Sequence, residues 1–393
     1  MSRSPTEKPL KTSTWIVHGG RDPFAYEGFV NPPVYRGSTV LYKTLEAIDT
    51  GKQKFTYGRY GSPTMRALEE AICGLEGGSR TLVQSSGLAA VTTALLSFVK
   101  AGDHILVADT VYRPTRTFCN GMLKDLGVET TYYDPAIGAD IESLIRPGTR
   151  LVYAESPGSQ TFELQDIPAI ASVTQRRDLW LLVDSTWGSP LYFKPLSLGA
   201  DVSIQAATKY IVGHADAMLG SLTMNERARP LVEKGQYVLG NNAGTEEIYL
   251  GLRGLRTIEV RLERHWRSGL AMADWLAGRP EVERILHPAR PEFPNHALWK
   301  RDFLGASGLF SVVLKPVPRD ALRAMLDGLE LFGMGYSWGG YESLVVPFDP
   351  AGYRTATSWT GGNCCLRFHI GLEDVADLQA DLDAGFARLR AAM

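Results

Sequence analysis

The stretch VSIQAATKYIVGH, residues 202–214, decides how the rest of the chain is interpreted. A short apolar run, typical of a strand, ends in small residues and presents one lysine, Lys209, before Gly213 lets the backbone turn sharply. An isolated lysine at the end of a strand usually extends to solvent. A lysine that arrives from the interior instead has a partly desolvated amine with a lowered pKa, which is what a Schiff-base lysine requires.

An acidic residue ends the preceding apolar run. Residues 179–183, LWLLV, fit a strand that is buried on both faces of a parallel sheet. Asp184 follows at the carboxyl end, where open α/β sheets bind ligands. Alone, Asp184 is explained as well by a helix cap. Paired with Lys209 one strand later, it predicts the anion that keeps the ring nitrogen of pyridoxal phosphate protonated while the lysine holds C4′.

Four short motifs follow one another in this part of the chain: DST at 184–186, QAATKY at 205–210, GH at 213–214 and DAM at 216–218. Together they resemble the pyridoxal-phosphate-dependent enzymes of cysteine and methionine metabolism, and within that family they are most similar to the β-lyases. The similarity extends from about Thr14 to the C-terminal helix. It implies an aspartate-aminotransferase-like fold, pyridoxal 5′-phosphate as the cofactor, and a carbon–sulfur lyase.

The resemblance also implies a reaction. A β-lyase of this family converts L-cystathionine by β-elimination to homocysteine, pyruvate and ammonia, within transsulfuration and methionine biosynthesis. Lys209 then removes the α-proton and, helped by Tyr112, protonates the leaving thiolate. A γ-lyase, γ-synthase or cysteine desulfhydrase of the same family is the nearest alternative. A pyridoxal-phosphate-binding regulatory protein is a remote one, because the composition has no DNA-binding character.

A second motif predicts a phosphate site. Residues 85–88, SSGL, join a strand to a helix, whose N-terminus offers free N–H groups and a positive dipole end. A Ser-Gly pair before a helix is usually only a cap. Because Lys209 and Asp184 follow in the expected order, we interpret Ser86, Gly87 and Leu88 as a phosphate cradle, with the Thr208 hydroxyl as a further donor.

The remaining site residues rest on the family resemblance. It implies that Tyr112 stacks on the cofactor ring and also meets the substrate, and that Arg367 clamps the substrate α-carboxylate. The resemblance also implies that Ser337, through its side chain or its backbone, contacts the same carboxylate. Trp338 stands where γ-lyase and synthase relatives tend to have a smaller aliphatic residue, and a tryptophan there resembles the β-lyases. Residues 241–248 are less familiar, and we expect them near the distal end of the substrate pocket.

The resemblance also predicts active sites that are shared between subunits. It implies that Tyr57 and Arg59 reach the cofactor phosphate of a neighbouring subunit, where Tyr57 also meets the substrate. The planar guanidinium of arginine suits phosphate oxygens. An exposed tyrosine and arginine in a loop are common, so these two residues alone do not decide the point. We expect at least a dimer, and a homotetramer built as a dimer of dimers.

Composition excludes several classes of partner. The formal net charge of −2 gives no electrostatic footprint for nucleic acid or an anionic membrane. No apolar run approaches the ~20 residues of a membrane span, and the first residues lack the apolar core of a signal peptide. The four cysteines, Cys73, Cys119, Cys364 and Cys365, fit reduced thiols, and the histidines have no metal-ligand spacing. We expect a cytoplasmic enzyme acting on a small sulfur amino acid, without a metal.

The periodicity of the chain predicts three parts. Residues 1–60 are an arm rich in Gly, Pro and Tyr. Residues 61–255 alternate strand and helix, which predicts a doubly wound, mostly parallel α/β sheet that binds pyridoxal phosphate. Residues 256–393 predict a smaller C-terminal α+β domain. One long helical pattern, from about residue 244 to 276, joins the last two parts.

Overall fold

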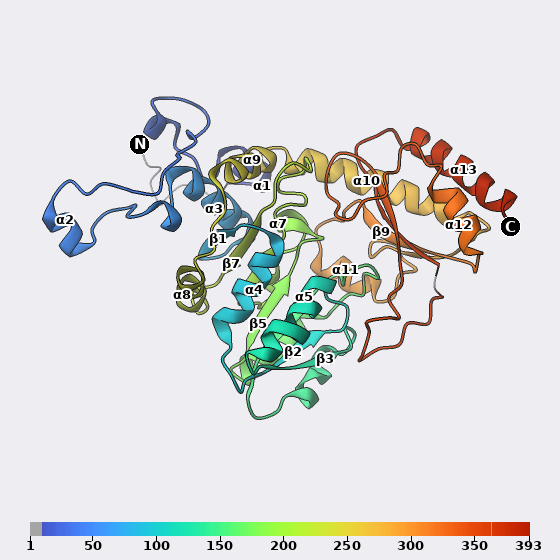
Figure 1. The fold of residues 1–393 in the computed structure, drawn as a ribbon, viewed down its shortest axis with the longest axis horizontal. Coiled ribbons are helices and arrows are strands. Elements are labelled where there is room, and N and C mark those ends of the chain that lie inside the picture. Colours follow the sequence, from blue (N-terminus) through green and yellow to red (C-terminus); the bar gives the residue numbers. More distant parts are fainter. Residues whose placement is uncertain (1–9, 363) are drawn as a thin grey trace.

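The computed structural model describes residues 10–362 and 364–393. Two β-sheets organise the chain, one of seven strands within residues 80–224 and one of four strands within residues 282–369 (Figure 1). Helix α10, Ile258–Ala277, follows the first sheet in the sequence and leads to the second. The N-terminal arm extends from the side of the large sheet (Figure 1).

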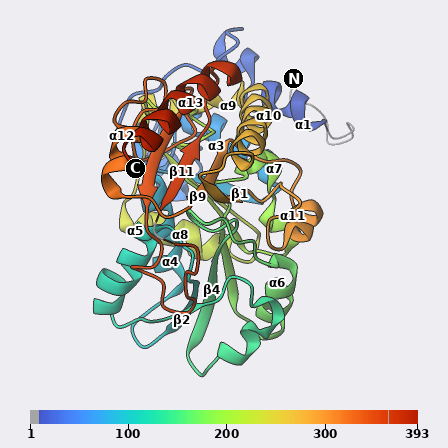
Figure 2. The ribbon, with the colours of Figure 1, turned by 90° about the vertical axis from the view of Figure 1, so that its right-hand side faces the viewer.

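The large sheet is mostly parallel. Its strands are β1 (Arg80–Gln84), β2 (His104–Ala108), β3 (Glu129–Tyr133), β4 (Thr149–Glu155), β5 (Trp180–Asp184), β6 (Val202–Gln205) and β7 (Gly220–Met224). Their order is β1-β7-β6-β5-β4-β2-β3, and β7 is antiparallel to both of its neighbours. Helices α4 (Gly87–Phe98) and α5 (Arg113–Phe118) lie on one side and α6 (Ile167–Arg176) on the other (Figure 2). The predicted doubly wound α/β sheet is confirmed.

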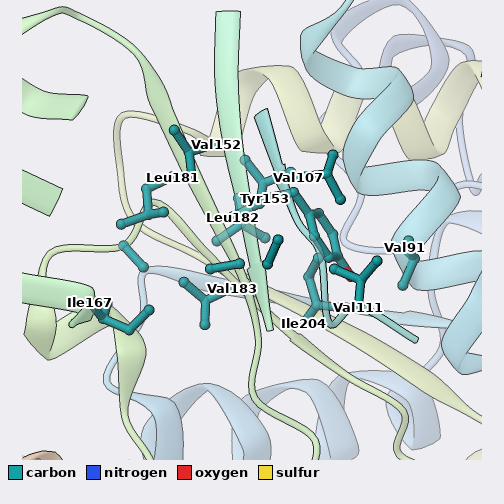
Figure 3. Close-up of a cluster of buried hydrophobic side chains, with 14 of the residues drawn as sticks. Val91, Val107, Val111, Val152, Tyr153, Ile167, Leu181, Leu182, Val183 and Ile204 are labelled. Atoms are coloured by element: carbon teal, nitrogen blue, oxygen red, sulfur yellow. The ribbon is translucent and has the colours of Figure 1, made fainter. Parts of the chain in front are cut away.

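Both faces of the central strands are buried. Leu181, Leu182 and Val183 are each 0% exposed, and Figure 3 shows them packed among side chains of β2, β4 and the helices. Successive side chains of a strand face opposite ways, so three buried neighbours require cover on both faces. Strand β7 was not predicted, because the alternation of polar and apolar residues in its sequence GSLTM is very short and no long apolar run accompanies it. Pairing with β1 and β6 stabilises it instead.

Helix α3, Pro63–Glu76, confirms a helix predicted from local signals. The hydroxyl of Ser62 accepts the N–H of Met65 at its start, and Gly77 ends it in the left-handed region at φ 73°. The apolar side chains that share one face are buried, as the spacing predicts. The other helices of this region are α7 (Ser189–Tyr192), α8 (Arg229–Leu239) and α9 (Thr245–Leu255).

The small sheet is antiparallel throughout. Its strands are β8 (Val282–Leu286), β9 (Leu309–Leu314), β10 (Leu344–Phe348) and β11 (Cys365–His369), in the order β10-β11-β9-β8. Helices α10, α12 (Arg319–Leu326) and α13 (Val375–Ala391) pack against it, and α11 (His296–Asp302) follows β8. These elements include the strands and helices that the sequence indicated for this part, whereas β8 and α11 were not predicted.

The prediction of one continuous helix from residue 244 to 276 is wrong, because the segment forms two helices, α9 and α10. α9 ends at Leu255, and Thr257 has φ −116° and ψ 11°, outside the helical range. The Arg261 guanidinium donates to the carbonyl oxygens of Gly254 and Tyr210, at 2.7 and 2.9 Å. A contact across 51 residues thus fixes the break, which local periodicity does not reveal. The domain boundary predicted near residue 255 falls at this break, and we retain it as a proposal.

The described part of the arm, from Leu10 onward, has little regular structure. It contains the short helices α1 (Thr12–His18) and α2 (Leu45–Thr50). Large apolar side chains stand exposed along it, among them Phe24 and Leu41 at 85% each. Across the described residues, the longest apolar helices fall short of a membrane span. Among the same residues, no group of three or more His, Cys, Asp or Glu side chains is placed to hold a metal ion.

Candidate active site

The site lies at the carboxyl edge of the large sheet. Strands β4, β5 and β6 run parallel, so their ends meet there, with Glu155 directly beside Asp184 in the register. Lys209 follows β6 by four residues, in a turn whose N–H groups bond back to Ala206 and Ala207 carbonyls. This is the edge at which open α/β sheets bind ligands.

Lys209 is half-buried and faces the C-terminal part of the chain. Its Nζ donates a hydrogen bond of 2.6 Å to the Ser337 hydroxyl and lies 5.4 Å from the centre of the Trp338 ring. Burial and the nearby charge of Arg367 lower the pKa of Lys209 to about 8, although Asp184 opposes the shift. A larger share of this amine is therefore unprotonated near neutral pH than in an ordinary lysine.

Arg367, on strand β11, reaches the same place. Its Nη2 donates to the Ser337 carbonyl at 3.0 Å, and burial lowers its pKa to about 10. The turn after Ser337 packs closely on the lysine, because a Cβ at Gly339 would lie 2.9 Å from the Lys209 Cα. The structure thus brings Lys209, Ser337, Trp338 and Arg367 together although they come from distant parts of the sequence.

Asp184 is buried at the end of β5 and has neutral hydrogen-bond partners. One carboxylate oxygen accepts from the Thr186 hydroxyl at 2.6 Å and from its N–H at 3.0 Å. Burial raises the pKa of Asp184, and the two Thr186 bonds and the charge of Lys209 only partly oppose the rise. A buried carboxylate in this condition is stabilised by any cation that a ligand brings.

Tyr112 follows β2 and is attached to the same edge by a residue that the sequence reasoning missed. Its N–H donates to the Glu155 carboxylate at 2.6 Å, and its side chain is 46% exposed. Burial, with the charges of Glu155 and Asp184, raises the pKa of Tyr112. Glu155 ends a strand, as Asp184 does, and this shared position was the signal that could have identified it.

Ser86, Gly87 and Leu88 lie at the start of helix α4, where their binding of a phosphate stays a prediction, and Gly87 has a second reason to be glycine. The Ser86 hydroxyl accepts the Ala89 N–H at 3.0 Å, whereas the N–H groups of Gly87 and Leu88, in the first turn of the helix, have no acceptor within the helix itself. A Cβ at Gly87 would lie 2.5 Å from that of Ala206, which packs α4 against the turn before the lysine.

Thr208 lines a cavity that Ser337 and Trp338 also border, but its hydroxyl already has partners. It donates to the Leu219 carbonyl at 3.0 Å and accepts the Leu219 N–H at 2.9 Å. The cavity measures about 870 Å³, and its walls include Ser85, Thr208, Ser337, Trp338, Gly244 and Glu247. The segment 241–248 therefore borders the predicted site, and Asn241 bonds the Ser85 hydroxyl at 3.0 Å.

Within one chain, Tyr57 and Arg59 do not line the cavity that Thr208 and Ser337 border. Arg59 Nη1 donates to the Tyr237 carbonyl at 2.9 Å, and Nη2 donates to the Tyr60 hydroxyl at 2.8 Å. Arg59 lines a different cavity, of about 230 Å³, between the arm and α8. The Tyr57 side chain is 42% exposed, with its ring 5.8 Å from that of Tyr60.

The cysteines lie apart from this chemistry. Burial raises the pKa of Cys119 to about 12 and that of Cys365 to about 11, so both remain thiols at neutral pH. Cys364, the neighbour of Cys365 in the sequence, is also buried. Burial likewise raises the pKa of Cys73. The residues at the Lys209 edge do fit pyridoxal phosphate: a desolvated amine for its aldehyde, a buried carboxylate for its ring nitrogen and a helix N-terminus for its phosphate.

Comparison with known proteins identifies the family. The model of the Cys/Met metabolism PLP-dependent enzymes matches residues 13–387. The chain belongs to this family. Its cofactor is therefore pyridoxal 5′-phosphate. The chain is 43% identical to "Cystathionine beta-lyase MetC" of Escherichia coli, over 96% of this chain and 99% of that protein.

Other relatives carry other names. A crystal structure titled as metB from Corynebacterium glutamicum matches with a TM-score of 0.90 and 30% identity, over 97% of this chain and 98% of that one. A Wolbachia pipientis protein named L-alanine/L-glutamate racemase is 37% identical over 97% of this chain and 98% of its own length. The family is thus shared by proteins whose names describe different reactions on amino acids.

Proposed function

We propose that the chain is a carbon–sulfur lyase that cleaves L-cystathionine by β-elimination to homocysteine, pyruvate and ammonia, as in methionine biosynthesis. The observation that carries this proposal is the group formed by Lys209, Ser337, Trp338 and Arg367. It places a lysine of lowered pKa beside a guanidinium suited to an α-carboxylate. Relatives named cystathionine β-lyase, 40–44% identical over nearly the whole chain, support the choice of substrate.

Each residue has a task in this proposal. Arg367 binds the substrate α-carboxylate and fixes the orientation of the α-carbon, which is the main contribution of positioning. The Lys209 amine takes the α-proton and then delivers a proton to the leaving sulfur, and Tyr112 assists at that second step. When bound, pyridoxal phosphate supplies the electron sink. Asp184 would balance the positive charge of its ring nitrogen, and Ser86, Gly87 and Leu88 would hold its phosphate. The Thr208 hydroxyl would join them only by turning its proton away from the Leu219 carbonyl.

The products of one incubation with cystathionine test the proposal. Pyruvate together with homocysteine supports it. Formation of 2-oxobutyrate and cysteine means γ-elimination, and interconversion of L- and D-amino acids without a keto acid means a racemase. Cofactor binding without turnover of any sulfur amino acid indicates a regulatory role. Trp338→Leu serves as a companion variant, since it removes the ring beside Lys209 and is expected to lower the preference for β-elimination.

We further propose that the functional unit is a homotetramer in which each site borrows Tyr57 and Arg59 from a neighbour. The exposed apolar side chains of the arm support burial against another subunit. Mixing Arg59→Ala with Lys209→Ala subunits tests this, because only hybrid sites combine both native residues. Recovered activity supports sharing, and no recovery from subunits shown to exchange contradicts it. We also retain the cytoplasmic location as a proposal.

A further inference from the structure

A turn at residues 337–340 gathers the groups that would handle the substrate. The Ser337 hydroxyl accepts from Lys209, and its carbonyl accepts from Arg367. The backbone of this turn has φ 80° at Ser337 and 89° at Gly339. A side chain such as that of Ser337 rarely adopts the left-handed region unless its surroundings hold it there.

The ring of His369 contacts the backbone of this turn. Its Nε2 lies 3.2 Å from the Gly339 nitrogen and 3.0 Å from the Gly340 carbonyl oxygen. The residue is 1% exposed, and among the described residues its other ring nitrogen finds no hydrogen-bond partner. The polar contacts of the imidazole are therefore directed at the turn.

Arg367 and His369, the two residues that form hydrogen bonds with the turn, both lie on strand β11. Alternate residues of a strand share a face, so Arg367 and His369 point the same way. Pairing with β9 fixes their register, with His369 opposite Leu309. The His369 ring also packs 5.2 Å from His265 and 6.2 Å from Tyr210, the residue directly after Lys209.

We propose that His369 is a positioning residue that orients Lys209 and Arg367 through the 337–340 turn. Burial lowers the pKa of His369 to about 3, so the ring is neutral at neutral pH. In one tautomer Nε2 accepts the Gly339 N–H, and in the other it donates to the Gly340 carbonyl. In either tautomer the ring forms a hydrogen bond to a backbone group of the turn, the Gly339 N–H or the Gly340 carbonyl. The kinetic part of this inference rests on the proposed function, whereas its spectroscopic part does not.

His369→Phe in the holoenzyme tests the inference, because phenylalanine keeps the ring but removes both nitrogens. We expect KM for cystathionine to rise about ten-fold and kcat to fall by a smaller factor, since the carboxylate clamp and the amine both lose their fixed partner. The pH midpoint of the visible absorption of the bound cofactor is expected to fall, because the lysine nitrogen loses the Ser337 acceptor.

Two further variants make the result decisive. His369→Gln places an amide near the position of Nε2 and should restore most of the wild-type KM and midpoint. His287→Phe alters another fully buried histidine, which bonds the Ala289 N–H, and should change neither. A His369→Phe protein with wild-type KM and midpoint would overturn the inference. If that variant does not fold, a His369→Gln protein that folds with the wild-type Tm but keeps neither value would also overturn it.

Discussion

Two buried aspartates at the same edge of the large sheet have opposite pKa shifts. Asp109 directly follows β2, and Asp184 ends β5. Burial alone raises the pKa of both. In Asp109, hydrogen bonds from Thr355, Thr357 and Arg116 outweigh that effect, so its pKa is lowered. In Asp184, burial prevails, and its pKa is raised.

The difference lies in the partners. Asp109 accepts a 2.6 Å bond from Arg116 and the N–H groups of Thr355, Ala356 and Thr357, which attach a loop of the small-sheet region to the large sheet. Asp184 accepts instead from the hydroxyl and N–H of Thr186, and the Tyr153 hydroxyl is a further neutral partner that lowers its pKa. The Asp109 carboxylate is paired with a cation of the chain itself and therefore stabilises the fold. The Asp184 carboxylate has only neutral hydrogen-bond partners and is suited to pair with a cation that a ligand brings.

The largest expected effect is that of Asp184→Asn on catalysis. The amide cannot balance a positive ring nitrogen, so we expect kcat/KM to fall ~10²–10³-fold. The unfolding free energy of the cofactor-free protein should stay the same or increase, because a costly buried charge is removed. Steady-state kinetics measure the fall in kcat/KM, and denaturant unfolding measures the free energy of unfolding. A clear loss of stability in the cofactor-free protein would contradict the difference proposed between Asp184 and Asp109.

Asp109→Asn should act on stability. It leaves the buried Arg116 guanidinium without its anion, so we expect a loss of about 3 kcal/mol in unfolding free energy. Urea unfolding at neutral pH measures it. An unchanged midpoint, with activity lost instead, would show that Asp109 serves the chemistry rather than the fold.

The same pair predicts a dependence on pH. A carboxylate whose pKa is lowered in the folded state contributes stability that is present above its unfolded pKa of about 4 and is lost as the pH falls further. The difference in unfolding free energy between wild type and Asp109→Asn should therefore be constant at neutral pH and shrink below about pH 4. A constant difference down to the acid limit would argue against a charged Asp109.

Thr186→Val has the smallest expected effect and refines the comparison. The Thr186 hydroxyl donates to Asp184 and accepts the Ala206 N–H at 2.9 Å. Its loss removes one of the bonds that oppose burial, so the pKa of Asp184 should rise further. We expect cofactor affinity to fall about ten-fold, measured by titration of the cofactor-free protein, with Thr174→Val, a buried threonine of α6, as the control.

Local patterns predicted the elements that carry the chemistry. The apolar run before Asp184, the small residues before Lys209 and the Ser-Gly pair before α4 are all contiguous signals, and each marks the end of a strand or the start of a helix. For that reason the strand edge that holds these residues could be located from the sequence.

The missed features depend on contacts between distant residues. His369 meets Gly339 across 30 positions, and Asp109 meets Thr355 across 246. Strand β7 and the break at Thr257 likewise follow from pairing partners rather than from their own residues. The shared site remains a prediction for the same reason, since Arg59 reaches Tyr237 within one chain and a phosphate only if a second subunit is present.

The residue that binds the cofactor covalently can be located directly on the chain. The holoenzyme is reduced with borohydride and digested, and the labelled peptide is identified by mass spectrometry. Lys194, another half-buried lysine, is the internal comparison. We expect the label on the peptide that contains Lys209, and we expect the Lys209→Ala protein to be colourless and unlabelled. A label on another lysine, or a Lys209→Ala protein that retains the reducible colour, would contradict it.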